Sequence, residues 1–207
     1  MNTTPDFSAE QNMLAQGKAC IVGVDEVGRG PWAGPVVAAA VWIDPAKIPL
    51  GATDSKKLSA KKRDALAEII WRDAKCSIAE CSVEEVDKLN IREATFLAME
   101  RAVAGLNLPV DYIYVDGNAL PKNLPNTAEA ETVVKGDSKI LSIACASIVA
   151  KVYRDKMMAD LAKTHPHYAW ERNAGYGTKA HQEGLATHGV TVHHRRSFKP
   201  IKMLLEA

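Results

Sequence analysis

The sequence predicts a mixed α/β fold with a helical C-terminal portion. Apolar runs of strand length alternate with periodic stretches of helix length over the first three quarters of the chain. The last quarter has loop and helix patterns only. No internal repeat or linker-like stretch divides the 207 residues, a length that suits one large domain. We therefore expect a single domain over 1–207, with an α/β core at about 18–163 and a helical portion at about 164–207.

Five segments have the composition of strands. The runs 19–24 and 36–43 are compact and apolar, and a loop rich in Gly and Pro separates them. Segment 76–81 alternates in character, whereas 112–115 and 132–134 are β-branched and aromatic. The first two strands could pair antiparallel because the loop between them is short. Strands separated by helices could pair parallel.

Helices are expected between and after these strands. Ser59 can cap a helix that ends near Arg72, and Ser82 with Glu85 forms a capping-box pattern that opens a short helix. The polar lead-in 1–17 could hold a further short helix. Additional helices are predicted at about 91–106, 138–163 and from a Thr178 cap to 188.

The charge of the chain is unevenly distributed. Its 26 Lys and Arg against 25 Asp and Glu give a net charge of +1, which as an average argues against a strongly basic nucleic-acid binder. Residues 1–150, however, carry 16 basic and 20 acidic side chains, and residues 151–207 carry 10 and 5 together with all six histidines. The split indicates a body that binds cations and a C-terminal part that meets anions, with solvated surface charge as an equal alternative.

Cysteine usage and hydropathy indicate a reduced, cytoplasmic chain. No apolar run reaches the ~18 residues of a membrane span, and the polar N-terminus lacks the pattern of a signal peptide. The four cysteines form no C-x-x-C pair and lie in apolar segments, where we expect buried free thiols.

Carboxylates beside glycines follow three of the predicted strands. Asp25 and Glu26 come after the first, Asp116 after the fourth and Asp137 after the fifth. Each acid alone could be a cap or turn residue. Functional groups of α/β sheets gather at strand ends, however, and four such charges together need a compensating proton or cation. Oxygen ligands of this kind select Mg²⁺ or Mn²⁺, ions that can activate water and stabilise the leaving oxygen of a phosphodiester.

The neighbouring positions of Asp25 and Glu26 impose a condition on this site. Adjacent residues of a strand face opposite sides, so both can reach one site only if the strand ends or bulges there. The following Gly28-Arg29-Gly30 loop makes such a departure easy. It could also lay backbone N–H groups and a guanidinium against a sugar-phosphate backbone, or be only a permissive turn.

Seven motifs in order, over about residues 20–200, closely resemble bacterial ribonuclease HII, of the type 2 ribonuclease H family. Val27 is a small departure, because the family usually has Ala there. The motifs are Asp25-Glu26-Val27-Gly28-Arg29-Gly30-Pro31-Trp32-Ala33-Gly34-Pro35-Val36-Val37, Asp54-Ser55-Lys56-Lys57-Leu58-Ser59, Val115-Asp116-Gly117-Asn118, Lys135-Gly136-Asp137, Ala146-Ser147-Ile148-Val149-Ala150-Lys151-Val152-Tyr153-Arg154-Asp155, Gly175-Tyr176-Gly177-Thr178-Lys179-Ala180-His181 and His194-Arg195-Arg196-Ser197-Phe198.

The resemblance implies a ribonuclease H-like fold, with a central five-stranded mixed sheet flanked by helices and a helical C-terminal extension. It also implies endonucleolytic cleavage of RNA in RNA/DNA hybrids and beside single ribonucleotides in duplex DNA, leaving a 5′-phosphate and a 3′-hydroxyl. The expected cofactor is Mg²⁺ or Mn²⁺. The implied metal ligands are Asp25, Glu26 and Asp116, with Asp137 as the fourth acid of the site.

The same resemblance assigns substrate contacts. The backbone of Gly28, Arg29 and Gly30 would sense the ribose 2′-hydroxyl, and Tyr176 would stack on the sugar after the ribonucleotide. Three further residues suit phosphate binding by position: Lys56 precedes a helix, and Ser147 and Lys151 lie four apart on one helical face. We interpret Asp155 as an ion-pair residue, and we expect His194 to line the nucleic-acid side or to pack locally, without zinc.

Two other functions remain open at this stage. The chain could be a non-catalytic hybrid-binding module, although its four acids would repel phosphate without a metal. It could also be a nuclease or phosphotransferase that acts on DNA, although Gly28-Arg29-Gly30 and Tyr176 favour ribose recognition. We expect a monomer, no membrane contact and no clear sliding-clamp motif at 201–207.

Overall fold

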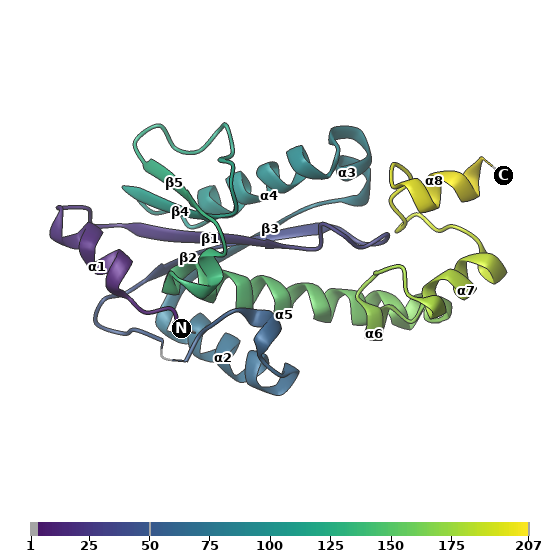
Figure 1. The fold of residues 1–207 in the computed structure, drawn as a ribbon, viewed down its shortest axis with the longest axis horizontal. Helices are drawn as coiled ribbons and strands as arrows, with labels where there is room; N and C mark the ends of the chain where they lie inside the picture. The colour runs from purple at the N-terminus through teal and green to yellow at the C-terminus, as the bar shows by residue number, and fades with distance from the viewer. Residues whose placement is uncertain (1–3, 50, 207) are drawn as a thin grey trace.

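A five-stranded mixed sheet forms the centre of the molecule, in the order β3-β2-β1-β4-β5 (Figure 1). This computed structural model describes residues 4–49 and 51–206. Residue 207, the end of the segment 201–207 in which we expect no clear sliding-clamp motif, lies outside the described part. The strands are β1 (Ile21–Val27), β2 (Val36–Ile43), β3 (Ala74–Cys81), β4 (Tyr112–Asp116) and β5 (Glu129–Val133).

The pairing of the early strands agrees with their short connection. β1 pairs antiparallel with β2, and β2 pairs antiparallel with β3. β1 pairs parallel with β4, which the chain reaches through helices, as expected. β4 pairs parallel with β5 across the loop 117–128, so this parallel pair needs no helical crossover.

Helices cover both faces of the sheet, and a group of short helices extends it at one end (Figure 1). The α-helices are α1 (Ser8–Ala15), α2 (Ala60–Asp73), α3 (Val83–Leu89), α4 (Ile91–Gly105), α5 (Leu141–Thr164), α6 (Trp170–Asn173), α7 (Lys179–His188) and α8 (Lys199–Leu205). The 3-10 helices are η1 (Ser55–Lys57), η2 (Gly136–Ser138) and η3 (Pro166–Tyr168). No helix in the described part is both long and apolar enough to cross a membrane.

Alternate residues of β2 build two separate cores. Ala38 and Ala40 belong to the cluster that packs under α4, whereas Val37 and Ala39 belong to the cluster under α2 and α5. Successive side chains of a strand point to opposite faces, so a strand buried on both sides is apolar throughout. The continuous apolar run of β2 follows from this central position.

The C-terminal elements share a small core with the end of α5. Trp170 is its largest fully buried side chain, and Ala33 from the loop after β1 lies in the same cluster. The other members are Met158, Ala162, Tyr168, Leu185 and Ile201. The helical portion is therefore packed directly against the segment that follows β1.

Several boundaries differ from those predicted. β1 continues through Val27 instead of ending at residue 24, and β5 begins at Glu129. α5 begins at Leu141 because η2 occupies residues 136–138. Thr178 precedes α7 as expected, but its side chain makes no capping hydrogen bond. The capping box of Ser82 is confirmed, and all four cysteines are free thiols.

Candidate active site

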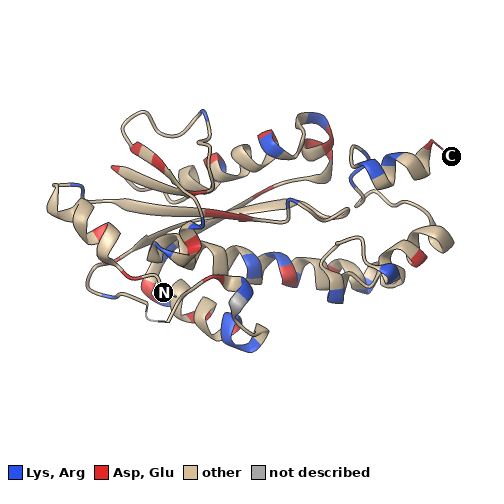
Figure 2. Ribbon diagram, viewed as in Figure 1, with Lys and Arg blue, Asp and Glu red and all other residues tan. Residues whose placement is uncertain are grey.

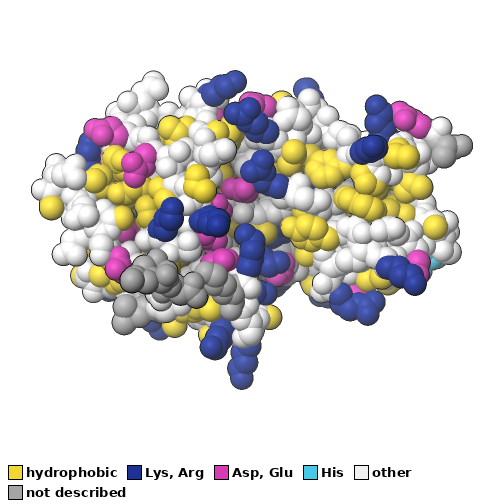
Figure 3. Space-filling model, in the orientation of Figure 1, with side chains coloured by type: hydrophobic (Ala, Val, Ile, Leu, Met, Phe, Trp, Pro, Cys, Tyr) yellow, Lys and Arg dark blue, Asp and Glu magenta, His cyan; other side chains and the backbone are white. Residues whose placement is uncertain are grey.

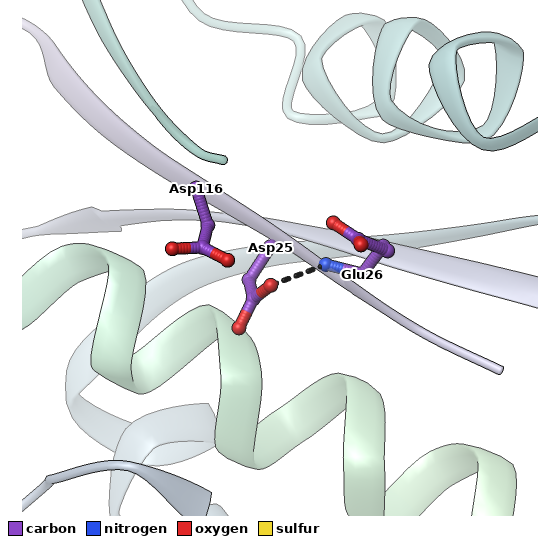
Figure 4. Close-up of side chains that lie close together, drawn as sticks. All are labelled: Asp25, Glu26 and Asp116. Atoms are coloured by element: carbon purple, nitrogen blue, oxygen red, sulfur yellow. Dashed lines mark hydrogen bonds between the residues drawn. The ribbon is translucent and has the colours of Figure 1, made fainter. Parts of the chain in front are cut away.

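Three carboxylates meet where β4 ends beside β1. The parallel ladder between these strands ends at Val24 and Val115, and the next residues are Asp25 and Asp116. One oxygen each from Asp25, Glu26 and Asp116 lies within 4.8 Å of the others, as Figure 4 shows. The predicted gathering of acids at strand ends is therefore present for these three residues.

Asp25 and Glu26 both reach one site although the strand that carries them continues, whereas on the sequence alone this required the strand to end or bulge there. β1 neither ends nor bulges there, because its ladder with β2 continues to Val27. The β4 side of the strand is open beyond Val24, so the two neighbouring side chains can approach Asp116 from the two faces of β1. The backbone N–H of Glu26 donates to Oδ1 of Asp25 over 2.7 Å, which fixes the Asp25 carboxylate.

Burial and like charge act together on this cluster. Asp25 is only 5% exposed, and its pKa is raised well above the ordinary value by burial and then by the charges of Glu26 and Asp116. Burial also raises the pKa of Glu26. The guanidinium of Arg29 has the smaller, opposite effect on this pKa, because its Nη1 lies 3.4 Å from Oε1 of Glu26. A bound cation would relieve this repulsion and restore the charged carboxylates.

The donor chemistry of the cluster fits a hard divalent cation. All three potential ligands are carboxylates, which suit Mg²⁺ or Mn²⁺ better than zinc. Among the described residues this is the one group of three or more acids, histidines or cysteines with such spacing. Asp25, Glu26 and Asp116 are thus the residues that could hold a metal.

Asp137 lies at the edge of this cluster instead of within it. It belongs to η2, and its pKa is raised by burial and then by the charges of Asp54 and Asp116. The preceding N–H of Gly136 donates to Oδ1 of Asp116 over 2.7 Å, which ties η2 to the site. Asp54 accepts a hydrogen bond from the backbone N–H of Lys56 at the start of η1. Sequence reasoning included Asp54 in a motif but did not predict that it lies near Asp137.

The glycine loop (residues 28–35) borders the carboxylates. Gly28 has a φ of +93°, a conformation that glycine adopts without strain. A Cβ at Gly30 would lie 3.2 Å from Cε1 of Tyr176, so that ring lies directly beside the loop. Tyr176 is 49% exposed, and Arg29 reaches from the loop to Glu26. The structure therefore places side by side the loop, predicted to sense the ribose 2′-hydroxyl, and Tyr176, predicted to stack on the following sugar.

The three predicted phosphate contacts lie in different surroundings. Lys56 is exposed in η1, close to Asp137. Ser147 is buried next to Asp25, and its hydroxyl shares a 2.9 Å hydrogen bond with that of Ser55. Lys151 donates to Asp155 over 2.6 Å, which confirms the ion-pair interpretation of Asp155.

A hollow of about 390 Å³ adjoins the cluster on the side of α4. Its lining includes the acids Glu26 and Asp116 and three further polar residues, Arg29, Arg92 from α4 and Asn118. In Figure 3 acidic side chains in the middle of the face are bordered by basic ones. Arg92 was missed from the sequence, where it is one charged residue of an ordinary amphipathic helix.

His194 packs locally, the second of the two alternatives considered for it. It is buried, and its Nε2 lies 3.0 Å from Nε2 of the equally buried His181. Trp170 also donates its indole N–H to Nε2 of His181. These rings form part of the C-terminal core and do not line the carboxylate site.

Fold and site together define a nuclease of the ribonuclease H-like fold class, with carboxylates at the adjoining ends of β1 and β4. The family model described as Ribonuclease HII matches residues 22–201. This chain therefore belongs to the ribonuclease HII family.

Individual relatives agree with this assignment. Ribonuclease HII of Ruegeria pomeroyi is 57% identical over 98% of this chain and 86% of its own length. The ribonuclease H2 structure from Pyrococcus horikoshii superposes with a TM-score of 0.78 and 25% identity, covering 91% and 98% of the two chains. Bst-RNase HIII in complex with Mn²⁺ shares the fold, with a TM-score of 0.72, 19% identity and coverage of 91% and 70%. Membership supports ribonuclease H activity on RNA/DNA hybrids and dependence on a divalent metal.

Proposed function

We propose that this chain is an endonuclease that hydrolyses the RNA strand of RNA/DNA hybrids and also incises at single ribonucleotides in duplex DNA. Its products carry 5′-phosphate and 3′-hydroxyl ends. The observation that carries the proposal is that two groups of residues lie next to each other, linked by the ion pair of Arg29 with Glu26. The carboxylates Asp25, Glu26 and Asp116 can hold metal, and beside them the glycine loop lies against Tyr176.

The acids have distinct places in this reaction. Asp25, Glu26 and Asp116 hold the metal, and Asp137 acts from η2 as the fourth acid of the site. A Mg²⁺ or Mn²⁺ ion held by these carboxylates would activate a water and stabilise charge at the scissile phosphate. Water adds to phosphorus and gives up a proton, the bond from phosphorus to the 3′ oxygen breaks, and that oxygen takes up a proton and leaves as the 3′-hydroxyl. Gly136 keeps the Asp116 carboxylate oriented through its N–H.

Substrate is held by residues around the cluster. The exposed backbone of Arg29 and Gly30 meets the ribose 2′-hydroxyl, with Gly28 providing the turn. The half-exposed ring of Tyr176 stacks on the following sugar. Lys56, Ser147 and Lys151 contact phosphates, Ser147 from its position beside Asp25.

Incubation with end-labelled duplexes tests the proposal. In Mg²⁺ or Mn²⁺, the wild type should cut a DNA duplex containing one ribonucleotide and an RNA/DNA hybrid, and should leave all-DNA duplex intact. Ligation and phosphatase treatment of the fragments identify their ends. If the wild type does not cut at the single ribonucleotide, the proposed incision at single ribonucleotides in duplex DNA is contradicted.

The Asp116→Asn variant tests the assignment of the site. It should lose at least about a hundredfold in kcat, because one metal ligand becomes neutral, while circular dichroism shows an intact fold. Glu131→Gln is the matched control: it neutralises an exposed acid on the adjacent strand β5 and should keep wild-type kcat. Full activity of Asp116→Asn would remove Asp116 from the metal site.

A further inference from the structure

Two arginines are completely buried and have no carboxylate partner among the residues that the structure describes. Arg195 is 0% exposed and Arg154 is 1% exposed. Within residues 4–49 and 51–206, neither forms an ion pair, although eleven such pairs involve other residues. Burying an unpaired charge is costly unless hydrogen bonds compensate it. Their bonding partners therefore show what these side chains do.

Arg195 donates only to backbone carbonyls of the glycine loop. Its Nη2 donates to Gly28 O over 2.6 Å, its Nη1 to Arg29 O over 3.1 Å and its Nε to Gly34 O over 2.8 Å. The planar guanidinium can engage several acceptors at once, and here it bridges the two ends of the loop. The adjoining backbone adds two bonds, from Arg195 N to Trp32 O and from Gly34 N to His193 O.

Arg154 holds the same loop from α5. Its Nε donates to Pro35 O over 3.0 Å and its Nη2 to Ala33 O over 3.1 Å. Its Nη1 donates to Ala174 O over 2.8 Å, two residues before Tyr176. A Cβ at Gly28 would lie 2.2 Å from Nε of Arg154, so the arginine needs glycine at that position. One side chain thus joins the loop to the segment that carries Tyr176.

The direction of these carbonyls determines the direction of the next N–H groups. In a trans peptide unit the C=O and the following N–H point to opposite sides, and the described residues have trans peptide bonds. The carbonyls of Gly28 and Arg29 point inward to Arg195, so the N–H groups of Arg29 and Gly30 point outward. Both residues are exposed, and neither N–H has an acceptor within the described chain.

We propose that Arg195 and Arg154, the arginine pair, are positioning residues for ribose recognition: they hold the glycine loop so that two backbone N–H groups face the substrate. This inference rests on the proposed function and extends it to residues that do not touch nucleic acid. Burial lowers the pKa of Arg195 to about 9 and that of Arg154 to about 10, as expected for buried cations that have no carboxylate in an ion pair with them among the described residues. The guanidinium of Arg195 also lies over the ring of Phe198, 5.1 Å from its centroid.

The Arg195→Lys variant tests the proposal. Lysine keeps the positive charge, but its compact ammonium lacks the planar fork of donors that lets the guanidinium bond to the carbonyls of Gly28, Arg29 and Gly34 together. The readout is discrimination: the ratio of Kd for all-DNA duplex to Kd for the same duplex with one ribonucleotide, in Ca²⁺ without turnover. We expect this ratio to fall about tenfold, the effect of about 1.4 kcal/mol of misdirected hydrogen bonding. KM for the single-ribonucleotide duplex should rise accordingly.

Arg196→Lys is the matched control. Arg196 is exposed, and its backbone, not its side chain, bonds to Asp87. It should change the affinities for both duplexes alike and leave the discrimination ratio unchanged. Hydrogen exchange adds a readout independent of activity, because the amides of residues 28–35 should exchange faster in Arg195→Lys than in Arg196→Lys.

The outcomes separate this inference from the proposed function. An unchanged ratio and unchanged exchange in folded Arg195→Lys overturn the role of the arginine pair. If that variant does not fold, Arg154→Lys gives the same test from α5, with the same expected and contrary results. A wild type that never cuts at a ribonucleotide contradicts the proposed function, whereas the exchange experiment still decides whether the arginine pair orders the loop.

Discussion

At the scale of single residues, the pair His181 and His194 shows how hydrogen bonds fix a protonation state. Thr191 donates its backbone N–H to Nδ1 of His194, so that nitrogen carries no proton. His194 must then donate from Nε2 to Nε2 of His181, and His181 donates from Nδ1 to Tyr176 O. A further proton on His194 would face an N–H donor inside the core.

The pH dependence of stability follows from this arrangement. Burial, and then the neighbouring His181, lowers the pKa of His194 from 6.5 to about 4. As the pH falls, the unfolded state therefore takes up a proton on His194 before the folded state does. The contribution of His194 to the free energy of unfolding is complete above pH 6.5 and is lost as the pH falls toward 4. His194 should contribute a loss of about 2 kcal/mol in unfolding free energy between pH 7 and pH 5. Urea unfolding at both pH values measures it.

Two variants isolate the contribution of His194. His194→Asn should be less stable than the wild type at pH 7, but its stability should fall less on going to pH 5. His188→Asn, at an exposed histidine, should keep the wild-type pH dependence. The same fall in His194→Asn as in the wild type would show that His194 is not the group that takes up the proton.

The acids of the site could be found from the sequence, and the arginine pair could not. Asp25, Glu26 and Asp116 stand out because acids beside glycines end apolar runs, a local pattern. Arg195 instead acts on carbonyls 166 and 167 residues earlier in the chain, where no side-chain chemistry marks the partner. Its motif showed only that an arginine is present.

At the scale of elements, one contact sets the distance between α5 and the sheet. A Cβ at Gly23 in the middle of β1 would lie 2.3 Å from the backbone N of Ile143 and the backbone C of Ser142. The start of α5 can therefore lie directly on β1 only because position 23 has no side chain. This contact also brings Ser147, a turn later on α5, beside Asp25.

Gly23→Ala should consequently destabilise the protein by about 3 kcal/mol or more, because backbone on both sides must move apart. Thermal and urea unfolding measure the effect. Gly105→Ala is the control: its Cβ would meet the hydroxyl of Ser77, which can rotate away. It should change stability by less than about 1 kcal/mol. Equal effects of the two substitutions would contradict the role of backbone approach.

Element types were predictable from periodicity and turn residues, and element ends were less so. The end of β1 was placed at residue 24 because two acids and a glycine follow it, yet β2 continues to pair with these residues. β5 was predicted too late in the chain because Glu129 and Glu131 alternate with smaller residues at the edge of the sheet, where polar side chains are tolerated.

At the scale of the whole molecule, basic side chains gather along the part that contains α5 and the later helices, while acids lie at the centre of the sheet (Figure 2). This agrees with 10 basic and 5 acidic side chains over residues 151–207. Near-neutral net charge thus conceals a surface with regions of opposite sign. A duplex can meet the basic region once a cation offsets the carboxylates.

Binding of a hybrid duplex should accordingly weaken as salt rises, because each phosphate contact releases a counterion. Lys56→Ala should reduce the slope of log K against log salt by about 1, the loss of one phosphate contact. Fluorescence anisotropy at several salt concentrations measures the slope. Lys75→Ala, at the end of the sheet beside Trp42 and away from Asp25, should leave it unchanged. Equal slopes for Lys56→Ala and the wild type would remove Lys56 from the phosphate contacts.

The bonds between Arg195 and the glycine loop also bear on the order of events as the chain is made. Synthesis proceeds from the N-terminus, so residues 28–35 leave the ribosome long before Arg195, which follows Arg29 by 166 residues. Strands β1 to β5 end at Val133 and can assemble earlier. A nascent chain can therefore possess its carboxylates while the loop beside them is still unheld. On the proposed role of the arginine pair, the held loop is therefore the later of the two parts of the site to form.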